Sequence, residues 1–399
     1  MKKLLIILLT LCTVIFAESS YYSQNGLGLT SNILSVRGQG MGNTGGAVMD
    51  SISLTASNPA FWYNFQTTSL QGFMNYSTQS SGKLDEGFRS SDLGGLAVKF
   101  PVGKFIGVVF GLKPQYRTDY NTNNLDSVEF DGNTVKFFTE SEYSGGISEA
   151  FLGFGYKFGS RLSVGLKSKL LFGNYDYENI TDKGNDGSYN SIITEKMEMR
   201  GLLSELGIGW HQPGNFTLGL SYTMHNAFRY KESINYFRGP DVDGKRLSLT
   251  LPEKFTVSLQ KKLIKQLYFT SDFYYLREYS DFVKKVEFFE DVKSDNSYFV
   301  GFGLEKTHDN GIHKEYWKNL DYRMGFFYKT EPFYKGDEKI KDIGISCGLG
   351  VPLNFNFSRV DVSFQYINRS GFLEDEIGKE SIYKVSLGIT TGGLWFKRF

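Results

Sequence analysis

Short segments in which apolar and polar residues alternate recur along most of this 399-residue chain. In the clearest segment, Val360, Val362, Phe364 and Tyr366 lie on one face of an extended strand, and the residues between them, which are polar, lie on the other. After residue 17, no apolar run approaches the roughly 18 residues that a membrane-spanning helix needs. The pattern therefore predicts many strands, each with one apolar and one polar face.

Alternation alone leaves two kinds of all-β fold open. A lipocalin or a sandwich turns its apolar face inward, whereas a transmembrane barrel turns that face toward lipid. The connections favour the barrel, because tight turns such as 101–104 and 158–161 alternate with long polar connections such as 119–140 and 231–246. This alternation is typical of a barrel with one rim in the periplasm and one outside. The connection 308–318 breaks the pattern, since it is long on the short-turn side.

The spacing of the turns predicts about 14 strands between residues 66 and 399. The composition agrees, because 45 glycines, 25 tyrosines and 35 phenylalanines suit strands with aromatic girdles. The segment 18–65 is left over, is rich in Gly, Asn and Ser, and has the size of a plug. We therefore expect an all-β fold: a transmembrane antiparallel β-barrel of about 14 strands with an N-terminal plug, or hatch, in the lumen.

The first 17 residues have the pattern of a signal peptide. A basic start precedes an apolar run from Leu4 to Phe16, and a small residue follows at Ala17. A retained helical anchor is the weaker interpretation, because such a run spans only about 20 Å of a hydrocarbon core of about 30 Å. The interpretation predicts export, with residues 66–399 as the barrel domain in a bacterial outer membrane.

Several kinds of chemistry find no support in the sequence. The 44 basic and 43 acidic residues nearly cancel, so no nucleic-acid partner is expected. The run Gly40–Gly45 matches a dinucleotide-binding pattern, but no strand precedes it and no helix pattern follows. His308 and His313 share a loop without an evident third metal ligand. No G-x-S-x-G motif occurs, and His225, the best-placed base, is expected to be a wall residue. We predict no cofactor, no metal and no enzymatic activity.

Two motifs in the leftover segment carry a resemblance to a known family. Gly40-Met41-Gly42 stands in a glycine-rich run, and Asn58-Pro59-Ala60 follows it. Together with Pro114 near the end of a predicted strand, they resemble the hatch and third strand of the FadL/TodX family of outer-membrane transporters for long-chain fatty acids and other hydrophobic compounds. The region from Arg359 to Phe399 is similar to the PorV-like branch, which serves a secretion apparatus.

The resemblance implies candidate ligand-binding residues in the plug and at a wall opening. Pro114 removes a ladder hydrogen bond and bends its strand, which either opens a lateral exit or is merely tolerated near a rim. Arg37 either meets a ligand carboxylate or pairs with Asp50 or an inner-wall acid. The Asn-Pro-Ala turn either lines a pocket or only fixes the plug's fold. The candidate residues are Arg37, Asn58, Pro59, Ala60, Pro114 and Tyr116.

The sequence therefore predicts an outer-membrane channel for the passive uptake of hydrophobic compounds such as long-chain fatty acids, through a plugged barrel with a lateral wall opening. The alternative is a PorV-like partner that binds and hands over secreted proteins. The expected partners are hydrophobic small molecules or fatty acids and outer-membrane lipid. Resemblance to outer-membrane barrels also implies that the barrel-assembly machinery engages the terminal Phe399. The chain is expected to be a monomer that binds no nucleic acid.

Overall fold

The computed structural model describes most of the chain after the predicted signal peptide. The signal peptide, Phe399, His225 and His313 lie outside the described residues. No helix within the described part is long and apolar enough to cross a membrane. The described residues are 20–24, 26–31, 34–83, 87–130, 133–182, 191–224, 226–236, 242–289, 291–308, 315–353 and 358–393.

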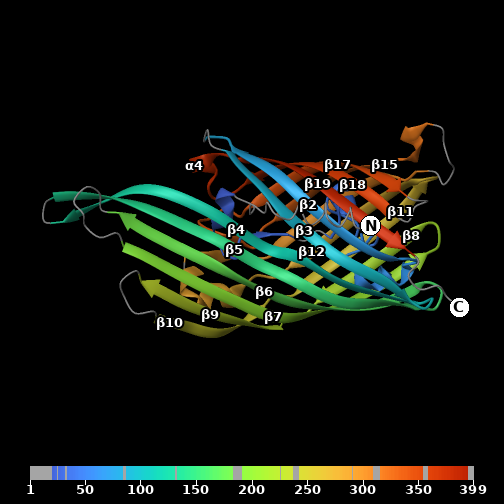
Figure 1. Ribbon diagram of the computed structural model, residues 1–399, viewed down its shortest axis with the longest axis horizontal. Coiled ribbons are helices and arrows are strands. Elements are labelled where there is room, and N and C mark those ends of the chain that lie inside the picture. Colours follow the sequence, from blue (N-terminus) through green and yellow to red (C-terminus); the bar gives the residue numbers. More distant parts are fainter. Residues whose placement is uncertain are drawn as a thin grey trace.

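Antiparallel strands surround a single lumen (Figure 1). The wall strands are β2 (Thr68–Ser81), β3 (Gly87–Val102), β4 (Ile106–Phe130), β5 (Asn133–Phe158), β6 (Leu162–Asp182), β7 (Ser191–Gln212), β8 (Phe216–Thr223), β9 (Asn226–Tyr236), β10 (Val242–Leu251), β11 (Lys254–Ile264), β12 (Leu267–Leu276), β14 (Ser297–Lys306), β15 (Asp321–Thr330), β17 (Lys341–Leu353), β18 (Ser358–Ser370) and β19 (Glu380–Gly393).

The remaining elements are short. They are η1 (Tyr21–Gln24), β1 (Leu29–Thr30), α2 (Val36–Gln39), η2 (Pro59–Asn64), α3 (Ser280–Lys285), η3 (Glu287–Phe289), β13 (Lys293–Ser294), η4 (Tyr316–Asn319), β16 (Phe333–Tyr334) and α4 (Glu374–Ile377). The strands β13 and β16 form a two-stranded sheet of their own.

The wall closes as a barrel of 14 strands, which confirms the predicted all-β barrel. The main sheet has 17 strands, of which β1 belongs to the N-terminal segment, while β8 with β9 and β10 with β11 each form one interrupted wall strand. The ring closes because β19 pairs with β2 and β8 pairs with β11. Every pairing between wall strands is antiparallel.

Two predicted connections are wrong in the structure. The region 231–246 is mostly paired strand, because β9 continues to Tyr236, β10 begins at Val242, and Lys231 lies opposite Arg246. The region 119–140 is not a long loop, because β4 continues to Phe130 and β5 begins at Asn133. These residues pair in register from Asp119 opposite Ser144 to Phe130 opposite Asn133. Polar residues outnumber apolar ones here, so the sequence lacks the lipid-facing alternation that identified the other strands. Cross-strand hydrogen bonds alone continue the ladder beyond the apolar wall.

Side chains alternate between the two faces of the wall. On β7, Leu202, Leu206 and Ile208 are exposed on the outer surface, whereas Leu203 and Glu205 are buried inside. Outward apolar and inward polar residues are the pattern of a barrel whose outer solvent is lipid.

The N-terminal segment, residues 20–65 as far as they are described, runs through the lumen. The element η2 packs against β4, β5, β6 and β7, and α2 packs against β17, β18 and β19. Glycines on the inner wall permit close approach: a Cβ on Gly107 would lie 1.8 Å from the carbonyl oxygen of Trp62, and one on Gly325 would lie 2.1 Å from the nitrogen of Gly42. The wall backbone and the segment backbone are therefore in direct contact.

Candidate functional site

A buried set of charges joins the N-terminal segment to the wall, and we call it the arginine network. The Nε and Nη2 atoms of Arg37 lie 2.9 Å and 2.6 Å from the two carboxylate oxygens of Glu305 on β14. Arg323 on β15 donates to Glu305 at 2.8 Å and to Asp361 at 2.7 Å. The network consists of Arg37, Arg323, Arg359, Asp50, Glu305, Asp321 and Asp361.

The network keeps the carboxyl group of Asp50 in the ionised form. Burial by itself disfavours the charge on Asp50, but the guanidinium groups of Arg37 and Arg359 outweigh burial and keep the pKa of this carboxyl below its usual range. Beside the network, the Nδ1 atom of His308 lies 2.8 Å from Oδ1 of Asp321. Because each arginine contacts at least two acids, the network is a lock between α2 and the wall rather than an open binding site.

The Asn58-Pro59-Ala60 motif is a second anchor of the segment. Asn58 caps η2, since its Oδ1 accepts a hydrogen bond from the nitrogen of Ala60 at 2.9 Å. Its Nδ2 donates to the carbonyl oxygen of Leu220 on β8 at 2.9 Å. These contacts describe a turn that is tied to the wall.

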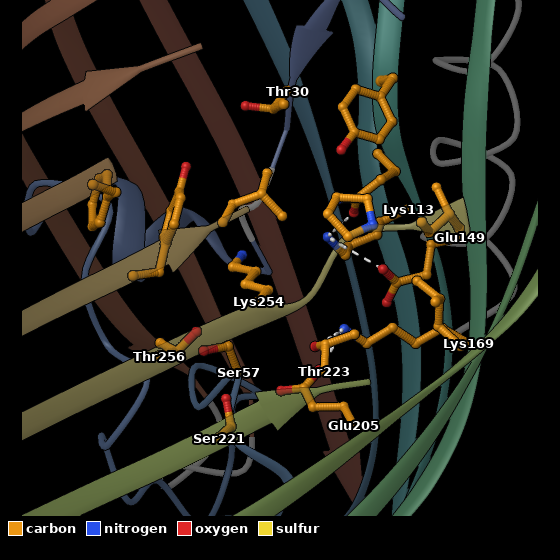
Figure 2. A pocket seen from close by; sticks show the side chains of 18 of the residues that line it. Thr30, Ser57, Lys113, Glu149, Lys169, Glu205, Ser221, Thr223, Lys254 and Thr256 are labelled. Atoms are coloured by element: carbon orange, nitrogen blue, oxygen red, sulfur yellow. Dashed lines mark hydrogen bonds and ion pairs between the residues drawn. The ribbon is translucent and has the colours of Figure 1, made fainter. Parts of the chain in front are cut away.

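The lumen holds a cavity of about 150 Å³, which we call the lysine chamber (Figure 2). Inward-facing residues of β4, β5, β6, β7, β11, β12 and β15 supply its charged side. Five lysines line it against three carboxylates, so the lining carries an excess of positive charge. These residues are Lys113, Lys167, Lys169, Lys254, Lys329, Glu149, Glu205 and Asp272.

Ion pairs join four of the chamber lysines to carboxylates, and the pair of Lys329 is with Glu331 outside the lining. Glu205 lies 2.5 Å from Lys169 and 3.1 Å from Lys167. Glu149 lies 3.9 Å from Lys113, which is the loosest of these contacts. Lys254 lies over the ring of Tyr274, with its Nζ 4.1 Å from the ring centroid. An ammonium group has three N–H donors, so a lysine with one carboxylate neighbour can also bind a second anion.

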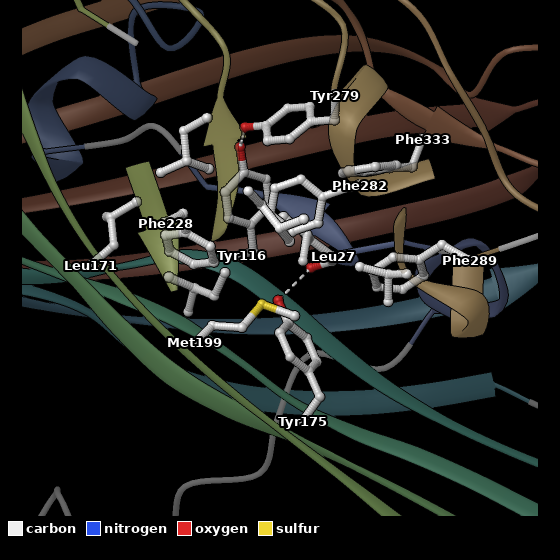
Figure 3. Close-up of a cluster of buried hydrophobic side chains, with 14 of the residues drawn as sticks. Leu27, Tyr116, Leu171, Tyr175, Met199, Phe228, Tyr279, Phe282, Phe289 and Phe333 are labelled. Carbon is white, nitrogen blue, oxygen red and sulfur yellow. Dashed lines mark hydrogen bonds between the residues drawn. The ribbon is translucent and has the colours of Figure 1, made fainter. Parts of the chain in front are cut away.

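Aromatic and aliphatic side chains supply the other side of the chamber (Figure 3). Tyr116 and Tyr279 are buried and join their hydroxyl groups in a hydrogen bond. Tyr274 and Phe299 stack with ring centroids 5.1 Å apart. Phe282 on α3 packs within the same cluster, so the connection after β12 folds inward and covers the chamber. One chamber thus combines a cationic and an apolar surface.

The wall changes its pairing beside the chamber. The β3–β4 ladder ends at Leu96 opposite Leu112, although both strands continue. Beyond that point the edge of β4 pairs with β1, where Leu29 lies opposite Arg117. Pro114 lies two residues past the last β3–β4 pair, and a bulge follows it in the β4–β5 ladder. At this fork, part of the N-terminal segment occupies the place of a wall strand.

The structure separates the residues that the sequence analysis grouped. Tyr116 lines the chamber, and Pro114 lies at the fork. Arg37 is engaged with Asp50 and Glu305. The Asn-Pro-Ala turn is bound to the wall and does not itself line the chamber, although Ser57 directly before it does. A ligand role for these residues stays a prediction.

The sequence analysis missed the lysine chamber itself. The available signal was a charged residue at an inward position of an apolar strand, as in Lys167 and Lys169 between Gly165 and Leu170. A charge that alternates with lipid-facing residues must face the lumen. Within the described residues, no group of three or more His, Cys, Asp or Glu side chains is arranged to hold a metal ion.

A family model described as BamG matches residues 1–399. The chain belongs to the BamG family. No curated protein matches this BamG-family chain in sequence.

Solved barrels share the fold of this BamG-family protein at low sequence identity. The toluene transporter TbuX of Ralstonia pickettii superposes with a TM-score of 0.57 at 12% identity, over 91% of this chain and 99% of that one. A FadL homologue of Pseudomonas aeruginosa gives 0.59 at 12% identity, over 91% and 98%. The toluene transporter TodX of Pseudomonas putida gives 0.54 at 13%, over 90% and 97%. The predicted FadL/TodX-like fold is confirmed, and this BamG-family chain is an outer-membrane β-barrel.

Proposed function

We propose that this barrel is a passive channel for hydrophobic molecules that carry an anionic group, such as long-chain fatty acids. The observation that carries the proposal is the two-sided lysine chamber. A carboxylate gains charge-assisted hydrogen bonds from lysines such as Lys113 and Lys254. An alkyl chain gains about 0.8 kcal/mol for each CH₂ that leaves water for an apolar surface such as that around Tyr274 and Phe299.

The chamber is too small for the alkyl chain of a long-chain fatty acid. Part of its lining therefore has to move, and the segment around β1 is the candidate. An apolar cavity of about 150 Å³ holds a molecule of roughly the size of benzene. The segment around β1 lies beside the chamber, because Thr30 contributes to the lining. A short ladder at Leu29 and Thr30 joins β1 to β4, and Ser31 donates a hydrogen bond to the carbonyl oxygen of Gln115. On its other side, Thr30 donates to Glu331 and accepts from Lys329, so only a few hydrogen bonds have to break for β1 to move. Displacement of β1 would enlarge the chamber and open the wall at the fork.

A disulfide across the fork tests this route. In a Cys347→Ser background, Leu29→Cys with Arg117→Cys places two thiols on directly opposed residues, whose Cα separation suits a disulfide. We expect the oxidised barrel to lose uptake of a labelled long-chain fatty acid in cells without another fatty-acid channel. Reduction should restore uptake to the level of the parent.

The matched control joins two strands that stay paired in the proposed cycle. Ser77 and Ser90 are opposed on β2 and β3, and their hydroxyl oxygens lie 2.7 Å apart. The variant Ser77→Cys with Ser90→Cys should take up fatty acid equally well when oxidised or reduced. Uptake by the oxidised 29–117 variant at the parental rate would refute the lateral route.

The second candidate is a PorV-like partner that binds and hands over secreted proteins. It is favoured by the length of β4 and β5, which run on as a paired hairpin far beyond the last β3–β4 pair (Figure 1). Replacing residues 121–142 by an Asn-Gly turn joins the opposed Tyr120 and Tyr143, removes that surface and leaves the chamber in place. Unchanged fatty-acid uptake with loss of a co-purifying secreted protein would favour this candidate.

A further inference from the structure

The outer surface of β7 changes abruptly from apolar to charged. The outward-facing residues Ile208, Leu206 and Leu202 are between 43% and 55% exposed and form part of the lipid-facing wall. The next outward-facing residues along the strand are Arg200 and Glu198, and both are exposed. The strand thus leaves the apolar band at Arg200.

The height of Arg200 matches the outer edge of that band. Trp210, near the short-turn end of β7, packs against Phe216 with tilted rings whose centroids lie 5.7 Å apart, and we assign it to the aromatic girdle at this end of the barrel. From Trp210 to Arg200 the strand rises about 34 Å at 3.4 Å per residue, or about 25 Å along the membrane normal for the usual barrel tilt. An apolar band about 25 Å tall therefore places Arg200 at the level of the outer lipid headgroups.

The neighbouring strands bring more cations to the same place, which we call the basic patch: Arg200, Arg229, Lys231 and Arg246. Arg200 lies directly opposite Arg229 on β9, and Lys231 lies directly opposite Arg246 on β10. The strands β7, β9 and β10 lie side by side (Figure 1). Directly opposed like charges destabilise an antiparallel pair.

The patch has little internal compensation. Glu198, opposite Lys231, is the one acid paired in register with a member of the patch in the described part of these strands. Among the described residues, no ion pair includes any of the four cations of the patch. An anion between the opposed pairs would convert their repulsion into attraction.

We propose that the basic patch binds the phosphate groups of a phosphorylated lipid in the outer leaflet. Arginine guanidinium groups bind phosphate through paired, charge-assisted hydrogen bonds, and three of the four cations are arginines. The patch faces sideways at headgroup height, directly above Leu202, so the acyl chains of the same lipid would lie on the apolar wall. This geometry fits a lipid better than a protein or nucleic acid that approaches from above.

The test uses the full-length barrel in phosphatidylcholine nanodiscs that contain a few mole per cent of diphosphorylated lipid A. The retained lipid is counted by native mass spectrometry after transfer to detergent. We expect Arg200→Gln with Arg229→Gln to retain at least about tenfold less lipid than the parent, because two charge-assisted contacts are lost. Lipid A without its phosphates should be retained poorly by both proteins.

A matched control removes two exposed arginines outside the patch. Arg89→Gln with Arg277→Gln makes the same change in net charge and should retain lipid as the parent does. Heat-modifiable gel mobility checks that all barrels are folded. Equal retention by the parent and the patch variant overturns the proposal, as does equal retention of the dephosphorylated lipid. Binding of inorganic phosphate without retention of lipid would overturn the assignment to a lipid.

Discussion

The arginine network and the lysine chamber lie on different sides of one lumen and use buried charge differently. The network joins β14, β15 and β18 to α2, and each arginine meets at least two carboxylates. The chamber uses lysines of β4, β6, β11 and β15 around an open volume, and those of β4 and β6 share Glu149 and Glu205. Planar guanidinium groups saturate carboxylates in a fixed geometry, whereas ammonium groups are point charges on flexible stems. The comparison suggests that the arginine network fixes the N-terminal segment to the wall, whereas the lysine chamber is the side available for contact with a ligand.

The largest effect should come from breaking the arginine network. Arg323→Met removes one of the buried guanidinium groups that compensate Glu305 and Asp361, which keep only Arg37 and Arg359. We expect the free energy of unfolding to fall by about 3–5 kcal/mol. Chemical unfolding followed by tryptophan fluorescence measures it. The control Lys293→Met breaks an exposed ion pair with Asp337 and should cost about 1 kcal/mol or less. Equal destabilisation by the two variants would show that the arginine network does not hold the N-terminal segment to the wall more strongly than an exposed ion pair would.

A smaller effect should follow from pushing the N-terminal segment off the wall near that network. A Cβ at position 325 would meet the backbone of Gly42 at 2.1 Å, so Gly325→Ala forces the two backbones apart. We expect a loss of about 1–3 kcal/mol and faster proteolysis within residues 34–65. Gly393→Ala is the control, because a Cβ there meets nothing within 4 Å. Unchanged proteolysis of Gly325→Ala would argue against close contact between the segment and the wall.

The smallest effect on folding, and the most specific one, should come from the chamber. Lys254→Met removes a cation beside Tyr274 while keeping an apolar side chain of similar length. We expect the affinity for a short fatty-acid anion to fall about tenfold, which corresponds to about 1.4 kcal/mol. Titration calorimetry on the purified barrel measures the affinity, and Lys261→Met on the same strand is the exposed control. A similar affinity in parent and variant would remove the lysine side from the proposed function.

The sequence by itself determined the wall. Alternating segments such as Val360–Tyr366 and the turns at 101–104 and 158–161 predict strands that the structure contains, because side-chain period and turn residues are local properties. The paired extension at 119–140 escaped the prediction, since a ladder outside the membrane needs no apolar face.

Only the tertiary structure decided what the lumen contains. Glu305 meets Arg37 across 268 positions of sequence, and Lys169 meets Glu205 only because β6 and β7 pair in one register. The pattern in each strand shows that such residues face inward. It does not show which strand lies across the lumen or where each charged side chain lies along the barrel axis. Closure of the ring and the path of the N-terminal segment set those positions, and closure is a property of all 14 strands together.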